Sequence, residues 1–435
     1  MPRFRRHAVC SPLTLASEAG LAVLRDGGNA VDAALATNLV LAVAYPHMCG
    51  VGGDVMAIVW RAGRLDGLVS CGRLPAAATL PADGVPTHGI GSATVPGAPA
   101  GWCALAERFG TRALRDLAAP AIRLAREGIV RSPGLARMTK WSSGLLERDP
   151  EATRIFLAPD RLVQPELADT LARLDAFHDG PVAAAAPPPF TPADFAAHVA
   201  TWVEPRRLAW RDVEVCELPP PSRGWLALDA LARLEPLDGL GPADAEFHRR
   251  QIRALHAAAF GGDTIYLCAV DGDGMAVSLN QSLFQAFGSG VVVPGTGVLL
   301  HNRGAYLTPE AYRGGAQPIH TLAPGLALRD GRPALVFGTM GGDAQPQIHL
   351  QLLARILVAG EDVADAVAAP RWTFDRSTVL VEDGLPALEP LPHGLGSLPM
   401  PVVDLAGHAH AIRVLAGGAL EAGCDPRADG VPVGD

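Results

Sequence analysis

The chain has 435 residues, of which 49% are hydrophobic and 19% charged, and it carries a formal net charge of -9. This composition is typical of a globular protein with a large core, and a negative charge without any basic run argues against a nucleic-acid-binding protein. The most apolar window, residues 33–45, is too short for a membrane span and contains Thr37 and Asn38.

The seven cysteines are scattered, odd in number and free of C-x-x-C spacing, which predicts reduced thiols. The N-terminus is basic but lacks the long apolar core of a signal peptide, so we expect a cytoplasmic protein. His408 and His410 have no third ligand beside them in a zinc-site pattern. We therefore expect neither a metal nor a cofactor.

The first elements read as two helices and a strand pair. Ser11 followed by Pro12 predicts a capped helix that ends at Gly27 and Gly28, and Asn29 predicts the cap of a second helix. Residues 55–60 and 65–70 are expected to pair as strands across Gly63. The two helices, rich in Ala and Leu, are expected to cover a sheet.

The middle of the chain is predicted to be mostly helical, and the Ala/Pro-rich residues 183–189 read as a surface loop. A second strand pair, 325–328 and 334–337, is expected across Asp330 and Gly331, before a helix over 345–359. The other expected elements are helices over 102–109, 117–126, 225–234 and 245–260 and a strand over 213–218.

A hairpin near residue 270 organises the chain. Apolar residues 265–270 follow Thr264, and a Gly/Asp-rich turn at 272–274 separates them from a second strand. With Gly272 and Asp273 as the central turn residues, Thr264 pairs with Gln281, next to Ser282. Two hydroxyl groups would then lie side by side at the open end of the hairpin.

A threonine at the start of a buried strand offers a particular chemistry. If the Asp263–Thr264 bond is cut, the new α-amino group, with a pKa of about 7.7 to 8.0, becomes a base for the hydroxyl of the same residue. The alternative is that Thr264 is simply a good strand former. Likewise, Gly341 and Gly342 before a helix form either an oxyanion hole or only a tight turn.

These stretches together resemble the γ-glutamyltransferase family of N-terminal-nucleophile hydrolases. Thr264 stands eight positions from Asp271, counting both ends, as the threonine that begins the family's small subunit does. The resemblance covers nearly the whole chain, and its segments keep the family's order: 27–34, 50–54, 95–97, 217–222, 288–290 and 338–342.

The resemblance implies an α+β fold, a four-layer αββα sandwich made as a proenzyme and cut between Asp263 and Thr264. Residues 1–263 and 264–435 would form a large and a small fragment of one domain, associated with each other, with a homodimer as a further option. Thr264 would attack an amide carbonyl, Gly341 and Gly342 would hold the oxyanion, and Ser282 would supply a second hydroxyl beside the nucleophile.

The substrate-binding positions depart from the family's γ-glutamyl pattern. Ala305 stands where the family uses an aspartate to bind the α-amino group, and Phe284 stands where it has an asparagine. Cys71 stands where the family uses an arginine for the α-carboxylate, and the arginine of this chain, Arg73, comes two residues later. Residues 45–48, 52–54 and 302–304 resemble instead the family's transferase-like amidohydrolase branch. We therefore expect a small carboxylate-bearing amide or acyl-amino compound as substrate. The expected substrate-binding residues are Arg73, Asn302, His320 and Thr321.

Two hypotheses follow. The first is an autoprocessed enzyme with Thr264 as nucleophile, a glutaryl-type acylase being one variant. The second is a non-catalytic, unprocessed relative that serves as a binding or scaffold protein. For Arg73 itself, the alternative to a side chain that reaches into a pocket is a solvated surface residue.

Overall fold

The computed structural model describes residues 2–255, 265–375 and 377–435. Two of the residues singled out above, Asp263 and Thr264, lie outside these ranges. In the described part of the chain, no helix is long and apolar enough to cross a membrane.

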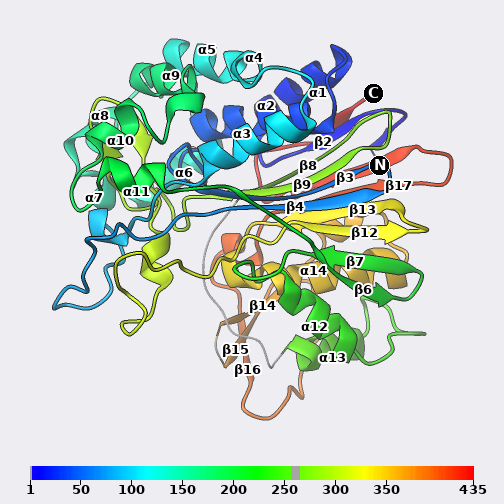
Figure 1. Cartoon of the computed structure of the whole chain (residues 1–435). Coiled ribbons are helices and arrows are strands. Elements are labelled where there is room, and N and C mark those ends of the chain that lie inside the picture. Colours follow the sequence, from blue (N-terminus) through cyan, green and yellow to red (C-terminus); the bar gives the residue numbers. More distant parts are fainter. Residues whose placement is uncertain (1, 256–264, 376) are drawn as a thin grey trace.

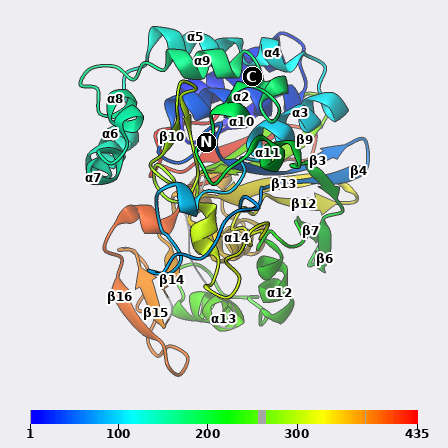
Figure 2. The same ribbon diagram turned by 60° about the vertical axis from the view of Figure 1, so that its left-hand side comes forward.

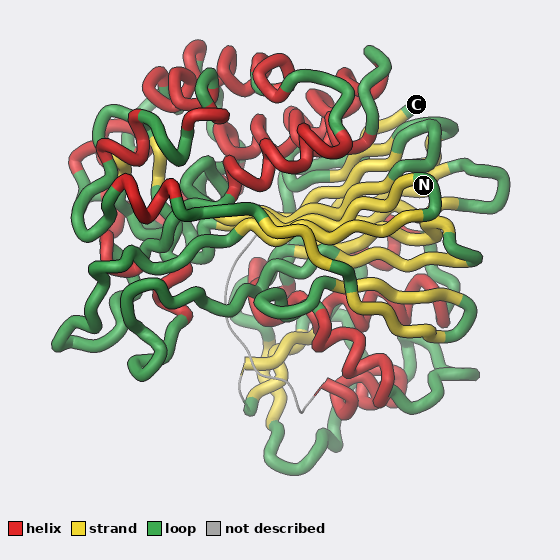
Figure 3. The backbone as a smooth tube through the Cα atoms, viewed as in Figure 1, coloured by secondary structure: helices red, strands yellow, loops and turns green. Residues whose placement is uncertain are grey.

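Two seven-stranded sheets form the centre of the molecule (Figure 3). The first has the order β19 (Val433–Gly434), β2 (Ala8–Cys10), β8 (Ile265–Val270), β9 (Ala276–Ser282), β3 (Asp54–Arg61), β4 (Arg64–Ser70), β5 (Thr201–Val203). The second has the order β1 (Arg3–Phe4), β18 (Leu420–Cys424), β17 (Ala409–Val414), β13 (Arg332–Thr339), β12 (Gly325–Arg329), β7 (Val213–Glu217), β6 (Arg206–Trp210).

Helices cover the outer face of each sheet, so the predicted αββα sandwich is confirmed (Figure 1). On the first sheet lie α1 (Thr14–Arg25), α2 (Ala30–Ala44) and α3 (Ala98–Phe109), with α4 (Leu114–Leu117), α5 (Ala119–Glu127) and α9 (Pro165–Leu171) above them. On the second lie α12 (Trp225–Arg233), α14 (Gln345–Leu353) and α15 (Val363–Ala368), and α13 (Ala245–Leu255) packs against α12 and α14.

Smaller elements extend one side of the sandwich (Figure 2). A three-stranded sheet lies beside the second helical layer, and short helices and a two-stranded ribbon flank the first. They are β14 (Trp372–Asp375), β15 (Thr378–Val381), β16 (Gly396–Pro399), β10 (Val292–Val293), β11 (Val298–Leu299), α6 (Pro133–Trp141), α7 (Ser143–Leu146), α8 (Pro150–Phe156), α10 (Pro181–Ala185) and α11 (Pro192–Ala196).

The α2 helix is buried along its whole length because it lies between the first sheet and the outer helices. A helix that is apolar on every side suits only such a position. As predicted, Asn29 caps it: its side chain accepts the N–H groups of Val31 and Asp32. The predicted Ser11 cap of α1 was wrong, because that hydroxyl bonds Ser17 Oγ at 2.7 Å and α1 begins at Thr14.

The face between the two sheets is apolar. Met56, Tyr266, Leu326 and Ile412 are among the buried residues that fill it, and β8 and β9 contact β13 directly. The two sheets are thereby held against each other, and the paired residues Asp54 and Ser282 lie together at one end of β3 and β9.

Candidate active site

The central hairpin joins the start of β8 to the end of β9. Ile265, the first described residue of β8, pairs with Gln281, and Ser282 ends β9. The predicted pairing of Thr264 with Gln281 was therefore wrong by one residue.

The turn explains the shifted register. The Asp271 carboxylate accepts the N–H groups of Asp273 and Met275, both at 3.0 Å. Gly274 N–H also donates to the Asp271 carbonyl at 3.0 Å, and Gly274 has a φ of 82°. These bonds hold three residues in the loop, where the prediction placed two.

Ser282 is buried at the point where the chain leaves β9. Its hydroxyl accepts the Phe284 N–H at 2.7 Å, and Phe284 has a φ of 78°, which a bulky side chain seldom adopts. Such strained backbone is frequent at functional sites and persists only where its surroundings hold it in place. The Ser282 side chain thus stabilises a turn that directs Phe284 toward the site.

Asp54, the first residue of β3, pairs with Ser282 and is the electrostatic centre of the site. One carboxylate oxygen accepts the Gly97 N–H at 2.9 Å and the Gly72 N–H at 3.3 Å, and the other accepts His320 Nε2 at 2.8 Å. Burial alone would raise the pKa of this carboxyl, but His301 and His320 outweigh burial and hold it at about 2. The carboxylate is therefore ionised in the interior.

His320 and Thr321, both predicted to bind substrate, lie within this cluster. Burial, together with the positive charge of Arg303, lowers the pKa of His320 to about 4, so its imidazole is neutral at neutral pH. Its Nδ1 has no hydrogen-bond partner among the described residues. Thr321 Oγ1 accepts a hydrogen bond from Arg303 Nη2 at 3.2 Å.

The other two predicted substrate residues are engaged elsewhere. Arg73 is exposed and donates from Nη1 to the Gly315 carbonyl at 3.1 Å. Asn302 is buried, and its amide donates to the Thr87 carbonyl and to Gln285 Oε1, both at 2.8 Å. Asn302 thus holds loops in position next to the site.

Gly341 and Gly342 lie between β13 and α14, as predicted. Their φ angles are 132° and 57°, a region that favours glycine. No described residue accepts a hydrogen bond from either N–H group. This turn can therefore present two N–H donors, as an oxyanion hole requires.

Asp343 follows these glycines and belongs to a polar cluster. Its carboxylate accepts the Tyr306 hydroxyl at 2.8 Å and Arg223 Nη1 at 3.0 Å. Burial raises the pKa of Asp343 to about 7, although Arg223 and Tyr306 oppose the shift. The cluster connects the turn to the short helix η3 (Arg303–Tyr306).

Arg303, like Asp54 and Asp343, is a site residue for which no role was predicted from the sequence. It is fully buried, and its guanidinium lies 4.1 Å from the centre of the Phe284 ring. One signal was available: Arg303 follows an apolar run, 298–300, within the Asn302–Gly304 segment that carries the family resemblance. Only the fold shows that this arginine is enclosed.

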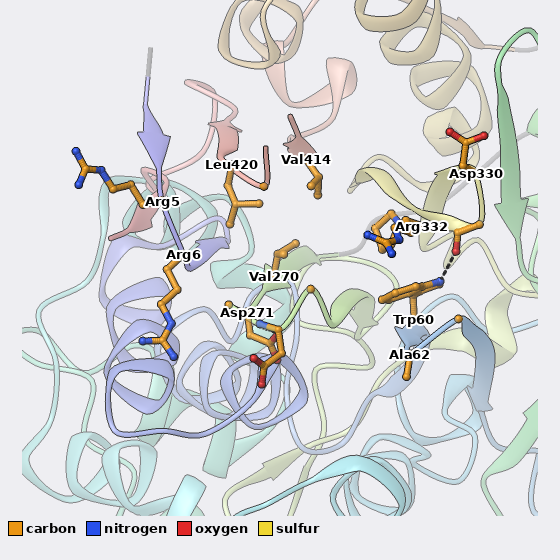
Figure 4. A pocket seen from close by; sticks show the side chains of 17 residues that line it. Arg5, Arg6, Trp60, Ala62, Val270, Asp271, Asp330, Arg332, Val414 and Leu420 are labelled. Carbon is orange, nitrogen blue, oxygen red and sulfur yellow. Dashed lines mark hydrogen bonds between the residues drawn. The ribbon is translucent and has the colours of Figure 1, made fainter. Parts of the chain in front are cut away.

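A pocket of about 770 Å³ lies at the opposite end of the strands (Figure 4). Arg6, Trp60, Asp271 and Arg332 line it, and Trp60 Nε1 donates to the Gly331 carbonyl at 3.0 Å. Six residue steps along β9, about 20 Å, separate Ala276 at this end from Ser282. The pocket is therefore not part of the candidate active site.

The αββα fold is that of an N-terminal-nucleophile hydrolase, and the comparisons with known proteins agree. The gamma-glutamyltranspeptidase family model matches residues 16–262 and 243–434. The chain is 32% identical to the glutathione hydrolase-like YwrD proenzyme of Bacillus subtilis (strain 168), over 99% of this chain and 98% of that protein. It is 33% identical to the oxamate amidohydrolase proenzyme of Klebsiella pneumoniae, over 98% and 97%.

Among solved structures, the cephalosporin acylase from Bacillus halodurans superposes with a TM-score of 0.92 at 29% identity, covering 100% of this chain and 96% of that one. The chain belongs to the gamma-glutamyltranspeptidase family. It is an enzyme of the amide hydrolase and acyltransferase class. Nothing in these comparisons favours the alternative of a non-catalytic scaffold.

Proposed function

We propose that this enzyme cuts its own chain between Asp263 and Thr264, and that the freed Thr264 then cleaves small amides that bear a carboxylate. The observation that carries the proposal is that the start of β8 and the end of β13 lie at one place: Asn280 Nδ2, near the end of β9, donates to the Ile265 carbonyl at 3.3 Å and to the Thr339 carbonyl at 3.1 Å. Ser282 ends β9, and the Gly341–Gly342 turn follows Thr339, so these groups share one edge of the sandwich. A nucleophile entering β8 would have a hydroxyl and two N–H donors nearby.

The printed names of the relatives support the same chemistry. Two of the similar proteins are proenzymes, and one is named for oxamate, a small molecule with both an amide and a carboxylate. Other matches are named acylases, one of them a cephalosporin acylase, which supports an acyl-enzyme reaction. We also propose a cytoplasmic location, which the seven free cysteines support.

The proposed reaction uses the α-amino group of Thr264 as its base. This amine takes the hydroxyl proton as the oxygen attacks the amide carbonyl carbon, and Gly341 and Gly342 donate N–H groups to the oxyanion. When the C–N bond breaks, the proton passes to the leaving nitrogen, and an ester remains on Thr264. Water then cleaves the ester, restoring the hydroxyl and releasing the acid, whereas an amine acceptor would give transfer.

The intact mass of the purified protein tests this proposal. We expect two fragments, 1–263 and 264–435, in the wild type, and one uncut chain of 45.2 kDa in Thr264→Ala. Thr264→Ser is the matched control, because it keeps a hydroxyl and should still be cut. An uncut wild-type chain after long incubation, or a cut Thr264→Ala chain, would contradict the proposal.

A further inference from the structure

Two fully buried arginines, Arg303 and Arg371, differ sharply in their partners. Arg371 is saturated: it bonds the Asp425 carboxylate at 2.6 Å and the carbonyls of Val367, Ala406 and Gly407. Arg303 donates from Nη2 to a hydroxyl, Thr321 Oγ1, while its Nε and Nη1 have no hydrogen-bond partner among the described residues. Arg371 is therefore a structural arginine, and Arg303 is not explained in that way.

The nearest acidic groups are not paired with Nε or Nη1 of Arg303. Asp54 is close enough to act on Arg303 electrostatically, but its oxygens are occupied by His320 and by two glycine N–H groups. Asp343 is bonded to Arg223 and Tyr306. A buried guanidinium without a paired anion is costly, so a site that keeps one is suited to an anionic ligand.

Arg303 adjoins the candidate active site. The preceding residue, Asn302, donates its N–H to the Leu283 carbonyl at 3.1 Å, one residue beyond Ser282. On its other side, the guanidinium bonds Thr321, whose neighbour His320 contacts Asp54. An anion held by Arg303 would thus lie close to the end of β9.

The surroundings of the guanidinium favour a planar anion. Its central carbon, Cζ, lies over the Phe284 ring, 4.1 Å from the ring centre, and 5.7 Å from the centre of the Tyr306 ring. These contacts to ring faces occupy none of the lone pairs that Nε–H and Nη1–H would bond to, so those donors still need an acceptor. A carboxylate accepts two parallel hydrogen bonds in the guanidinium plane.

We propose that Arg303, rather than the exposed Arg73, binds the carboxylate of the substrate's acyl group and thereby sets the enzyme's specificity. The inference rests on the proposed function. The expected acyl groups are those of short acids with a terminal carboxylate. This carboxylate would bind Arg303 next to the imidazole of His320. Arg73, which bonds a loop carbonyl at the surface, has no part in this recognition.

Two probe substrates test the assignment: glutaryl-p-nitroanilide and its neutral methyl ester. In the processed wild type, we expect kcat/KM to favour the acid by about 100-fold or more. In Arg303→Met this preference should fall to near one, mainly through a higher KM for the acid. Arg73→Met is the matched control and should keep the wild-type preference.

Intact mass is measured first for every variant, so that loss of self-cleavage is not mistaken for loss of recognition. If Arg303→Met is not cut, Arg303→Lys replaces it; this variant keeps the charge but not the planar fork, and we expect an intermediate preference. A cut Arg303→Met or Arg303→Lys enzyme with the full wild-type preference would overturn the assignment, as would loss of the preference in Arg73→Met.

The assignment can also fail or stand independently of the proposed function. If the wild-type chain is never cut, the binding of glutarate to the whole chain is measured by calorimetry instead. Binding by the wild type and at least about tenfold weaker binding by Arg303→Met would still support an anion site at Arg303. Equal binding by the two proteins, or none by either, would overturn it.

Discussion

At the scale of single residues, the site contains a buried, hydrogen-bonded pair, Asp54 and His320, in which only Asp54 is charged at neutral pH. Asp54 stays ionised, whereas His320 stays neutral because burial and the Arg303 charge lower its pKa to about 4. An unfolded histidine titrates near pH 6.5. Below pH 6.5 the unfolded chain therefore binds a proton at this histidine that the folded chain does not bind. This difference favours unfolding, so the free energy of unfolding decreases as the pH falls from 6.5 toward 4.

This linkage gives a prediction for acid stability. Between pH 7 and pH 5, His320 should account for about 2 kcal/mol of lost unfolding free energy. The variant His320→Gln keeps a nitrogen donor for Asp54 but cannot bind a proton, so its stability should fall less over the same range. Urea unfolding of the two proteins at both pH values measures the difference. Equal pH dependence would show that His320 is protonated as easily in the fold as outside it.

At the scale of elements, the turn between β13 and α14 makes a testable contribution. A Cβ at Gly341 would lie 3.3 Å from Gly407 Cα, and the φ of 132° is strained for any other residue. Gly341→Ala should therefore displace the N–H donors, and we expect kcat to fall by about 100-fold with a smaller change in KM.

A matched control separates this effect from backbone strain in general. Gly360 also has a positive φ, 73°, but a Cβ there would meet nothing within 4 Å. Gly360→Ala should lose about 1 kcal/mol of stability and keep its kcat. Steady-state kinetics and thermal unfolding are measured for both variants. If Gly341→Ala and Gly360→Ala had similar kcat values, an oxyanion role for the Gly341–Gly342 turn would be excluded.

The elements also show what the sequence could predict. Local signals were sufficient for the Asn29 cap, the β3–β4 pair across Gly63 and the β12–β13 hairpin, because each depends on residues close together in the chain. The Ser11 cap and the hairpin register failed because Ser17 and the Asp271 carboxylate offered competing hydrogen bonds.

The same reasoning applies to the site. His320, Thr321 and Ser282 were expected at the site through the family resemblance. The fold places His320 and Ser282 beside Asp54, and Thr321 accepts a hydrogen bond from Arg303. That Nε and Nη1 of Arg303 have no partner among the described residues could not be predicted, because it depends on which distant groups are already bonded to one another.

At the scale of the whole molecule, the two proposed fragments are interleaved. In the first sheet, β8 and β9 of the 264–435 fragment lie between β2 and β3 of the 1–263 fragment. In the second sheet, β12 pairs with β7 across the same division. Cutting one peptide bond would therefore leave both sheets and the apolar layer between them intact.

We accordingly predict that the cut enzyme remains one particle. Under native conditions the two fragments should co-elute in size-exclusion chromatography at the volume of uncut Thr264→Ala, and they should separate only in denaturant. The interface consists of buried strands that cannot be rebuilt by either fragment alone, so the separated fragments should not refold individually. Two independently folded species after the cut would contradict the shared-sheet arrangement, whereas a doubled particle mass in both proteins would indicate the homodimer.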